Sequence, residues 1–467
     1  MTVRERAHPA MLSLAACVAS LALVQSARAA ELMGRAVLPS ATFAPGPTSG
    51  QFTGGGNGIA TPFVGKQPVQ GFSAVLLGPK KGTYLVMMDN GFGAKANSPD
   101  SLLRVFAVKP DFETGTVVPV NRHTGVELPS FTEDGYFTLS DPDGRLPFPI
   151  VADRDDYPGT TPAGGTIAVD PSIQSGRLLT GADLDIESIR QVDDGTFWFG
   201  DEFGPYLVHT DAHGRVLEAP IPLPNLRRLP NTPGGTVVNP LVQSPSNPQL
   251  ARAADANLPN SGGFEGMALN ARGTMLYALL EKALNGDPVR ERLLIHEFSL
   301  KARAYTGETW GYIMDSPGNA IGDFTALSNR AFLVIERDNG QGNVSDPRFT
   351  QPARFKKIFK VDLDSADADG NLVKEEIADL MNIYDPRDVV GDGRTSTVFT
   401  FPFVTIEDVL VLDNNTLLVI NDNNFPFSAG REFGVADNEE FILIHTAPLL
   451  PDAECDHDDG RRNHGLR

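Results

Sequence analysis

The chain has 467 residues, a formal net charge of −20, 41% hydrophobic residues and only two cysteines. This length fits two or three domains or one large repeat architecture, and the apolar fraction is too high for a disordered acidic chain. Nucleic acids and anionic lipids are bound through clusters of Lys and Arg, so the acidity argues against both as main partners. It favours cations or metal-bridged ligands.

The N-terminus has the three parts of an export signal. Arg4 and Arg6 precede an apolar run over residues 11–24, and Ala27-Arg28-Ala29 is a small-x-small cleavage sequence. The run is too short to span a bilayer. We therefore predict a signal peptide over residues 1–29, a periplasmic or secreted protein, and no stable membrane insertion after cleavage.

Cleavage would change both the charge and the cysteine count. Leu14-Ala15-Ala16-Cys17 also resembles a lipoprotein cleavage box, which stays open as an alternative. Removal of residues 1–29, with three arginines and one glutamate, gives a net charge of −22. The remaining thiol, Cys455, lies in a polar tail over residues 451–467 and cannot form an intrachain disulfide.

Short β-branched and aromatic runs separated by Gly, Asp and Asn turns recur from about residue 70 to 446, which is the pattern of an all-β protein. A hydrophobic-small-hydrophobic step opens each of five related units, and each second strand of a unit ends in carboxylates or amides. The steps are Phe72-Ser73-Ala74-Val75, Ile186-Glu187-Ser188-Ile189, Phe264-Glu265-Gly266-Met267, Phe324-Thr325-Ala326-Leu327 and Ile406-Glu407-Asp408-Val409.

Five multi-strand units without strand-helix alternation predict one β-propeller over residues 30–450. The steps are 114, 78, 60 and 82 residues apart, so the blades carry long loop insertions. The longest gap can hold a further blade that includes residues 135–139, and six blades are therefore expected. Residues 32–38 are expected to close the last blade. A β-sandwich array is the alternative, but it does not explain why the acidic positions recur in phase.

The first strand of each blade lines the central channel of a propeller. The repeated position would therefore form a ring that includes Glu187, Glu265 and Glu407. Two charges 4 Å apart repel by roughly 4 kcal/mol at an effective dielectric of about 20, so such a ring needs a cation, shared protons or basic neighbours. Oxygen ligands of this kind fit Ca²⁺ most simply. The second-strand ends form a second ring at one mouth: Asp89, Asn90, Asp201, Glu202, Glu281, Glu336, Asp338, Asn421, Asp422 and Asn423.

Two other features have ordinary structural explanations. Residues 365–376 match an EF-hand loop at four positions, but the first position is Ser365 and a strand precedes the loop, which favours an acidic hairpin. His209, His296 and His445 end the third strands, where packing is more common than catalysis.

Six segments together resemble an exported bacterial family called phytase-like, which is also described as having esterase-like activity. The segments are Asp185–Ile189, Phe197–Pro205, Gly263–Met267, Val334–Asn339, Ile406–Val409 and Asn421–Asn424. The resemblance covers roughly residues 60–450. It implies a propeller and hydrolysis of a phosphoester.

We therefore expect a hydrolase that acts on a small anionic ester, a phosphoric monoester or a carboxylic ester, in an acidic channel of a monomer. A lactonase or sugar-acid hydrolase and a noncatalytic binding propeller are the alternatives. The expected metal ligands are Glu187, Glu265, Glu407, Asp422 and Asp201. The expected acids and bases are Glu202, Glu281 and Glu336, and the expected substrate-binding residues are Lys282, Arg337, Asn423 and Arg431.

Overall fold

A computed structural model describes residues 29–391 and 396–451. The predicted signal peptide and the polar tail with Cys455 lie outside the described residues, apart from Ala29 and Pro451. Among the described residues, no helix has the length and apolar character needed to cross a bilayer.

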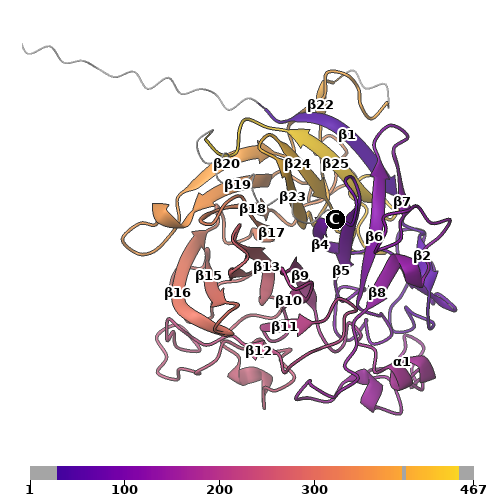
Figure 1. Ribbon diagram of the computed structural model, residues 1–467, viewed down its shortest axis with the longest axis vertical. Coiled ribbons are helices and arrows are strands. Elements are labelled where there is room, and N and C mark those ends of the chain that lie inside the picture. Colours follow the sequence, from indigo (N-terminus) through magenta and orange to yellow (C-terminus); the bar gives the residue numbers. More distant parts are fainter. Residues whose placement is uncertain (1–28, 392–395, 452–467) are drawn as a thin grey trace, which may run out of the picture.

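The described residues form five four-stranded blades around one axis, and the strands nearest the axis are β4, β9, β13, β17 and β23 (Figure 1). Each of these inner strands contacts the inner strand of the next blade, and β23 contacts β4 to complete the ring. The all-β propeller is therefore confirmed.

The blades follow chain order. The first is β4 (Phe72–Leu77), β5 (Tyr84–Met88), β6 (Arg104–Asp111) and β7 (Thr116–Pro119). The second is β9 (Ile186–Gln191), β10 (Phe197–Asp201), β11 (Tyr206–Thr210) and β12 (Ile221–Pro222). The third is β13 (Phe264–Leu269), β14 (Met275–Leu280), β15 (Arg292–Ser299) and β16 (Ala304–Ile313). The fourth is β17 (Ala320–Ala326), β18 (Ala331–Arg337), β19 (Lys356–Asp362) and β20 (Lys374–Asp379).

The fifth blade contains β23 (Asp408–Asp413), β24 (Thr416–Ile420), β25 (Glu439–His445) and the N-terminal strand β1 (Glu31–Leu38). The remaining elements lie in the connections. They are β2 (Phe43–Pro45), β3 (Lys66–Pro68), β8 (Tyr136–Thr138), α1 (Pro171–Gly176), β21 (Ile383–Tyr384) and β22 (Val398–Phe399), with 3₁₀ turns at Glu133–Gly135, Val151–Asp153, Ala253–Asp255 and Leu363–Ser365.

The expected number of six blades is wrong for the described residues, which form five. Residues 135–139 do not begin a further blade, because β8 pairs with β6 through Arg104 and Thr138, Val105 and Phe137, and Phe106 and Tyr136. Strand β7 covers only Val108–Asp111 of β6, so the other half of that edge is free to pair with β8. The long gap in the repeat is thus filled by an extended blade edge and by the loops around α1.

The N-terminal strand closes the ring, as expected for residues 32–38. Strand β1 pairs antiparallel with β25 from Glu31 opposite His445 to Leu38 opposite Glu439, and in Figure 1 it lies beside β25. The Arg35 guanidinium binds both carboxylate oxygens of Glu440 on β25, at 2.8 and 2.5 Å. Arg431 binds the same carboxylate from the other side, at 2.9 and 2.8 Å.

Apolar side chains fill the space between neighbouring blades. Between the third and fourth blades, Tyr277 packs on Phe332, and Phe332 packs on Phe324, with ring centroids 5.0 and 4.8 Å apart. The inner strands β13 and β17 are buried over nearly their whole length, so alternate residues of both faces lie in the interior.

Glu440→Gln is expected to destabilise the closing strand. Burial alone would raise the pKa of Glu440, but Arg431 and Arg35 outweigh it and lower this pKa from 4.5 to about 2. The stabilisation is therefore complete above pH 4.5 and is lost as the pH falls towards 2. We expect a loss of about 3 kcal/mol in urea unfolding at pH 7 and a smaller loss at pH 3.

Glu375→Gln is the control, because the Glu375 side chain is exposed and pairs with Lys360 on the surface. It should cost less than about 1 kcal/mol. Equal losses for the two variants, or a Glu440→Gln loss that grows as the pH falls, would contradict this account of ring closure.

Candidate functional site

The inner strands of the first three blades each contain one residue that is skipped in the pairing with the second strand. The skipped residues are Ser73, Glu187 and Glu265. A bulge of this kind re-aims a side chain. Glu187 and Glu265 line a cavity on the channel axis, and Glu407, directly before β23, lines it from the fifth blade. Ser73 donates a hydrogen bond to Glu407 at 3.1 Å.

The ends of the second strands supply a second set of side chains to the same cavity. This set consists of Asp89, Glu202, Glu281, Arg337 and Asp422. Successive side chains of a strand point to opposite faces. The preceding residues therefore do not line the cavity, and they are Met88, Asp201, Leu280, Glu336 and Asn421.

This cavity, which we call the channel cavity, has a volume of about 130 Å³. Eight carboxyl groups and one guanidinium, that of Arg337, line it together with amide and hydroxyl groups such as Asn90 and Thr405. The eight are Asp89, Asp185, Glu187, Glu202, Glu265, Glu281, Glu407 and Asp422.

Six of the carboxyl groups form two clusters. Asp89, Asp185 and Glu187 each offer one oxygen atom within 4.8 Å of the others, and Glu202, Glu265 and Glu281 do the same. Both sets contain oxygen donors only, which suits a hard divalent cation such as Ca²⁺. Asn90 donates to Asp185 at 2.7 Å and orients that carboxylate.

The clusters are electrostatically costly without a cation. Burial, and then repulsion by neighbouring carboxylates, raises the pKa of Glu187 and Glu265 well above the usual range. The same causes raise the pKa of Glu407 to about 8 and that of Asp422 to about 7. Arg337 offsets part of the charge by donating to Glu407 at 3.0 Å. The cavity thus favours protons or metal ions over free carboxylates.

The channel cavity brings together seven of the twelve residues expected from the sequence. They are Glu187, Glu202, Glu265, Glu281, Arg337, Glu407 and Asp422. Lys282 lies beside it, with Nζ 3.2 Å from Glu281 and a hydrogen bond of 2.9 Å to the carbonyl of Asn260.

Two expected residues, Asp201 and Glu336, are held in the strand framework. Asp201 accepts the backbone N–H groups of Asp185 and Gly204 at 2.8 and 2.7 Å. Glu336 is fully buried and accepts four donors at 2.7 to 2.8 Å. The donors are Tyr312 Oη, the backbone N–H of Asp315, Asn319 Nδ2 and Lys374 Nζ.

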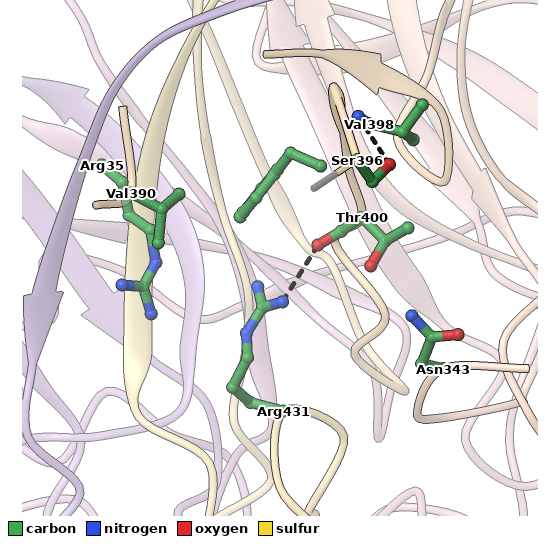
Figure 2. A pocket seen from close by; sticks show the side chains of 8 residues that line it. Arg35, Asn343, Val390, Ser396, Val398, Thr400 and Arg431 are labelled. Atoms are coloured by element: carbon green, nitrogen blue, oxygen red, sulfur yellow. Dashed lines mark hydrogen bonds between the residues drawn. The ribbon is translucent and has the colours of Figure 1, made fainter. Parts of the chain in front are cut away.

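The other two, Asn423 and Arg431, also lie away from the channel cavity. Asn423 donates to the carbonyl of Asp437 at 2.8 Å and to Gln70, and thereby fixes a loop. Arg431 lines a separate cavity of about 310 Å³, where it donates to the carbonyl of Thr400 (Figure 2).

Asp185 and Asp89 complete the first cluster, although neither was assigned a role from the sequence. Asp89 belongs to the ring of strand ends, which was its only signal. Asp185 lies directly before β9, and the same position of the other four units holds Gly71, Gly263, Asp323 and Thr405. Because only one of these four is acidic, comparison of the repeats gave Asp185 a weaker signal than Glu187, Glu265 and Glu407.

The EF-hand-like loop is built as an ordinary turn. Asp367 accepts the backbone N–H groups of Asp369 and Asn371 at 2.9 and 2.8 Å, and Glu376 pairs with Lys357 at 2.7 Å. His209 stacks on Trp198 with ring centroids 4.3 Å apart, as expected for packing.

A family model described as "Phytase-like: Esterase-like activity of phytase" matches residues 67–425. The chain belongs to this phytase-like family. It is also similar to an uncharacterized secreted protein of Arthroderma benhamiae, with 29% identity over 234 residues. That match covers 44% of this chain and 45% of the relative, so the chain spans less than half the length of this curated relative.

Solved structures with about the same extent are similar at low identity. A calcium-binding protein, regucalcin, from Agrobacterium tumefaciens has 11% identity and a TM-score of 0.32, with 89% of this chain and 100% of that chain covered. A protein of unknown function from Dyadobacter fermentans has 11% identity and a TM-score of 0.37, with 90% and 99% covered.

Glu336→Gln is expected to weaken folding. The substitution puts an NH₂ group where a carboxylate oxygen accepted hydrogen bonds. It also removes one of the two charge partners of the mostly buried Lys374, the other being Asp315. We expect a loss of about 3 kcal/mol in urea unfolding. A variant as stable as the wild type would contradict the assignment of Glu336 to the framework.

Proposed function

We propose that this member of the phytase-like family is an exported hydrolase that uses a divalent cation, most simply Ca²⁺, to cleave an anionic ester. The observation that carries the proposal is the convergence of eight carboxyl groups on a cavity of about 130 Å³ with one guanidinium to balance them. Phosphoric monoesters and carboxylic esters are the substrate classes we propose.

The cation would be held by the first cluster, Asp89, Asp185 and Glu187. When bound there, it would supply Lewis acidity and a more acidic water molecule. Asn90 fixes the orientation of Asp185 from outside this cluster, as its hydrogen bond of 2.7 Å indicates.

Glu281 and Arg337 are placed to act on the substrate. Glu281 Oε2 is buried without a hydrogen-bond partner among the described residues, although the Lys282 ammonium lies 3.2 Å away. A buried carboxylate oxygen that accepts no hydrogen bond can take a proton from an attacking water molecule. Arg337 presents a fixed guanidinium that can stabilise negative charge on the ester oxygens. Glu202 lies in the same cluster as Glu281 and can return a proton to the leaving group.

Export is supported by two independent observations. Residues 1–29 have the composition of a signal peptide. The similar Arthroderma benhamiae protein is described as secreted. Millimolar Ca²⁺ is ordinary outside cells, and weak extracellular sites bind with constants of about 10⁻⁴ to 10⁻³ M, so the proposed location suits the proposed metal.

The metal is tested by the melting temperature, Tm, of the chelated protein titrated with Ca²⁺. Ca²⁺ should raise Tm, since a ligand that binds only the folded state at 100 times its Kd adds about 2.7 kcal/mol. Glu187→Gln should leave the chelated protein no less stable, because it removes a repulsive charge from the first cluster, and should reduce the shift caused by Ca²⁺.

Glu336→Gln is the matched control, because it makes the same chemical change outside the channel cavity. It should lower Tm with and without Ca²⁺ and keep the full shift. A wild-type Tm that does not respond to Ca²⁺, Mg²⁺ or Mn²⁺ would contradict a metal site in the cavity.

The reaction is tested with an aryl phosphate, phytate and an aryl acetate in the presence of Ca²⁺. We expect turnover of at least one, and a fall in kcat of about a hundredfold or more in Glu281→Gln. Failure on all three would contradict the proposal. Turnover of lactones alone would indicate a lactonase, and an increase of Tm with Ca²⁺ but no turnover would indicate a binding propeller.

A further inference from the structure

A second and larger cavity opens beside the channel cavity, and we call it the groove. It has a volume of about 710 Å³ and lies between the loops of the third and fourth blades. The groove and the channel cavity share Glu281, Arg337 and Thr405 as lining residues, so a single ligand can occupy both.

The two volumes suggest a division of roles. Small-molecule sites usually measure about 300–1,000 Å³. At about 130 Å³, the channel cavity is too small for more than the reacting group and an ion, whereas the groove has the size of a small-molecule site. The non-reacting part of a substrate would therefore lie in the groove.

The charge of the groove is opposite to that of the channel cavity. Lys282, Arg290 and Arg337 line it, and Glu281 is the one carboxylate among its described lining residues. The channel cavity has eight carboxyl groups and one cation. The lining is therefore mainly acidic in the channel cavity and mainly basic in the groove, and Glu281 and Arg337 lie where the two meet.

Arg290 differs from the other two cations of the groove, because Arg337 pairs with Glu407 and Lys282 lies beside Glu281. Arg290 Nη1 donates to the carbonyl of Leu284 at 2.9 Å, which fixes the guanidinium at the β14–β15 loop. The neighbouring Asp287 does not neutralise it, because both of its oxygens bind Arg292 at 2.9 and 2.7 Å. Within residues 29–391 and 396–451, Arg290 forms no ion pair, so its remaining N–H groups can bind an anion.

The rest of the groove is largely apolar. Met314, Val404 and Pro259 line it, together with Pro317, Ala283 and Ala320. Asn319 and Asn339 are engaged with Glu336 and with the carbonyl of Gly318, so they shape the wall. A ligand that fits here combines an apolar body with an acidic end group.

We propose that the groove selects substrates whose non-reacting part is an apolar body with a second anionic group, and that Arg290 recognises this group. This inference rests on the proposed function only for the position of the reacting group in the channel cavity. Arg290 is a specificity residue that contacts the end of the substrate remote from the cleaved bond.

Binding of two non-hydrolysable probes tests the inference without turnover. Terephthalate has a carboxylate at each end of an aromatic ring, and 4-carbamoylbenzoate has an uncharged amide at one end. The two probes are compared by isothermal titration calorimetry of the mature protein with Ca²⁺. Terephthalate should bind about fivefold more tightly than 4-carbamoylbenzoate, because its second carboxylate forms an ion pair with Arg290 in a partly exposed site. Arg290→Gln should reduce this ratio to about one.

Arg272→Gln is the matched control, because Arg272 is exposed at the β13–β14 turn of the same blade and does not line the groove. It makes the same change in net charge and should keep the fivefold ratio. Equal binding of the two probes by the wild type would overturn the inference. So would an Arg272→Gln variant that lowers the ratio as much as Arg290→Gln, since the cause would then be net charge.

The two proposals can fail separately. A protein that shows the Arg290-dependent ratio but hydrolyses no ester supports the groove and contradicts the hydrolase. A protein that hydrolyses esters but binds both probes equally supports the hydrolase and contradicts the groove.

Discussion

Repulsion among eight carboxyl groups in one cavity of about 130 Å³ is the constraint on which the rest of the structure depends. Two such charges 4 Å apart repel by roughly 4 kcal/mol at an effective dielectric of about 20, and Arg337 can balance only one of them. The unbound cavity is therefore poised to take up protons or a cation. Only a rigid scaffold can keep the carboxyl groups together, and the closed ring with β1 fastened to β25 through Arg35 and Glu440 provides it.

The propeller concentrates the charge by two local rules. Inner strands bulge at Glu187 and Glu265, which turns those side chains onto the axis. At the end of each second strand one residue lines the cavity and the residue before it does not. The same alternation gives Glu202 to the cavity and Asp201 to the strand framework. The loops, which do not follow the repeat, add a groove of opposite charge on one side, so the mouth of the channel is electrostatically asymmetric.

The repeat made the propeller and the inner ring predictable, because Glu187, Glu265 and Glu407 occupy the same step of three units. The strand ends were harder, since a list of acidic residues does not show which of two neighbours faces the axis. Glu336 and Arg337 illustrate this, because the carboxylate faces the framework and the guanidinium faces the cavity. The number of blades was overestimated because β8 extends an existing edge. The groove could not be predicted, since most of its residues, Arg290 among them, come from loops without repeat.

A cation bound by the channel carboxylates is the central claim, and a crystal structure of the protein grown with Ca²⁺ tests it most directly. The account predicts anomalous density in the channel cavity, with carboxylate oxygens of Asp89, Asp185 and Glu187 at about 2.3–2.6 Å from the ion. Density for water alone, with these carboxylates hydrogen-bonded to one another as protonated groups at saturating Ca²⁺, would contradict it.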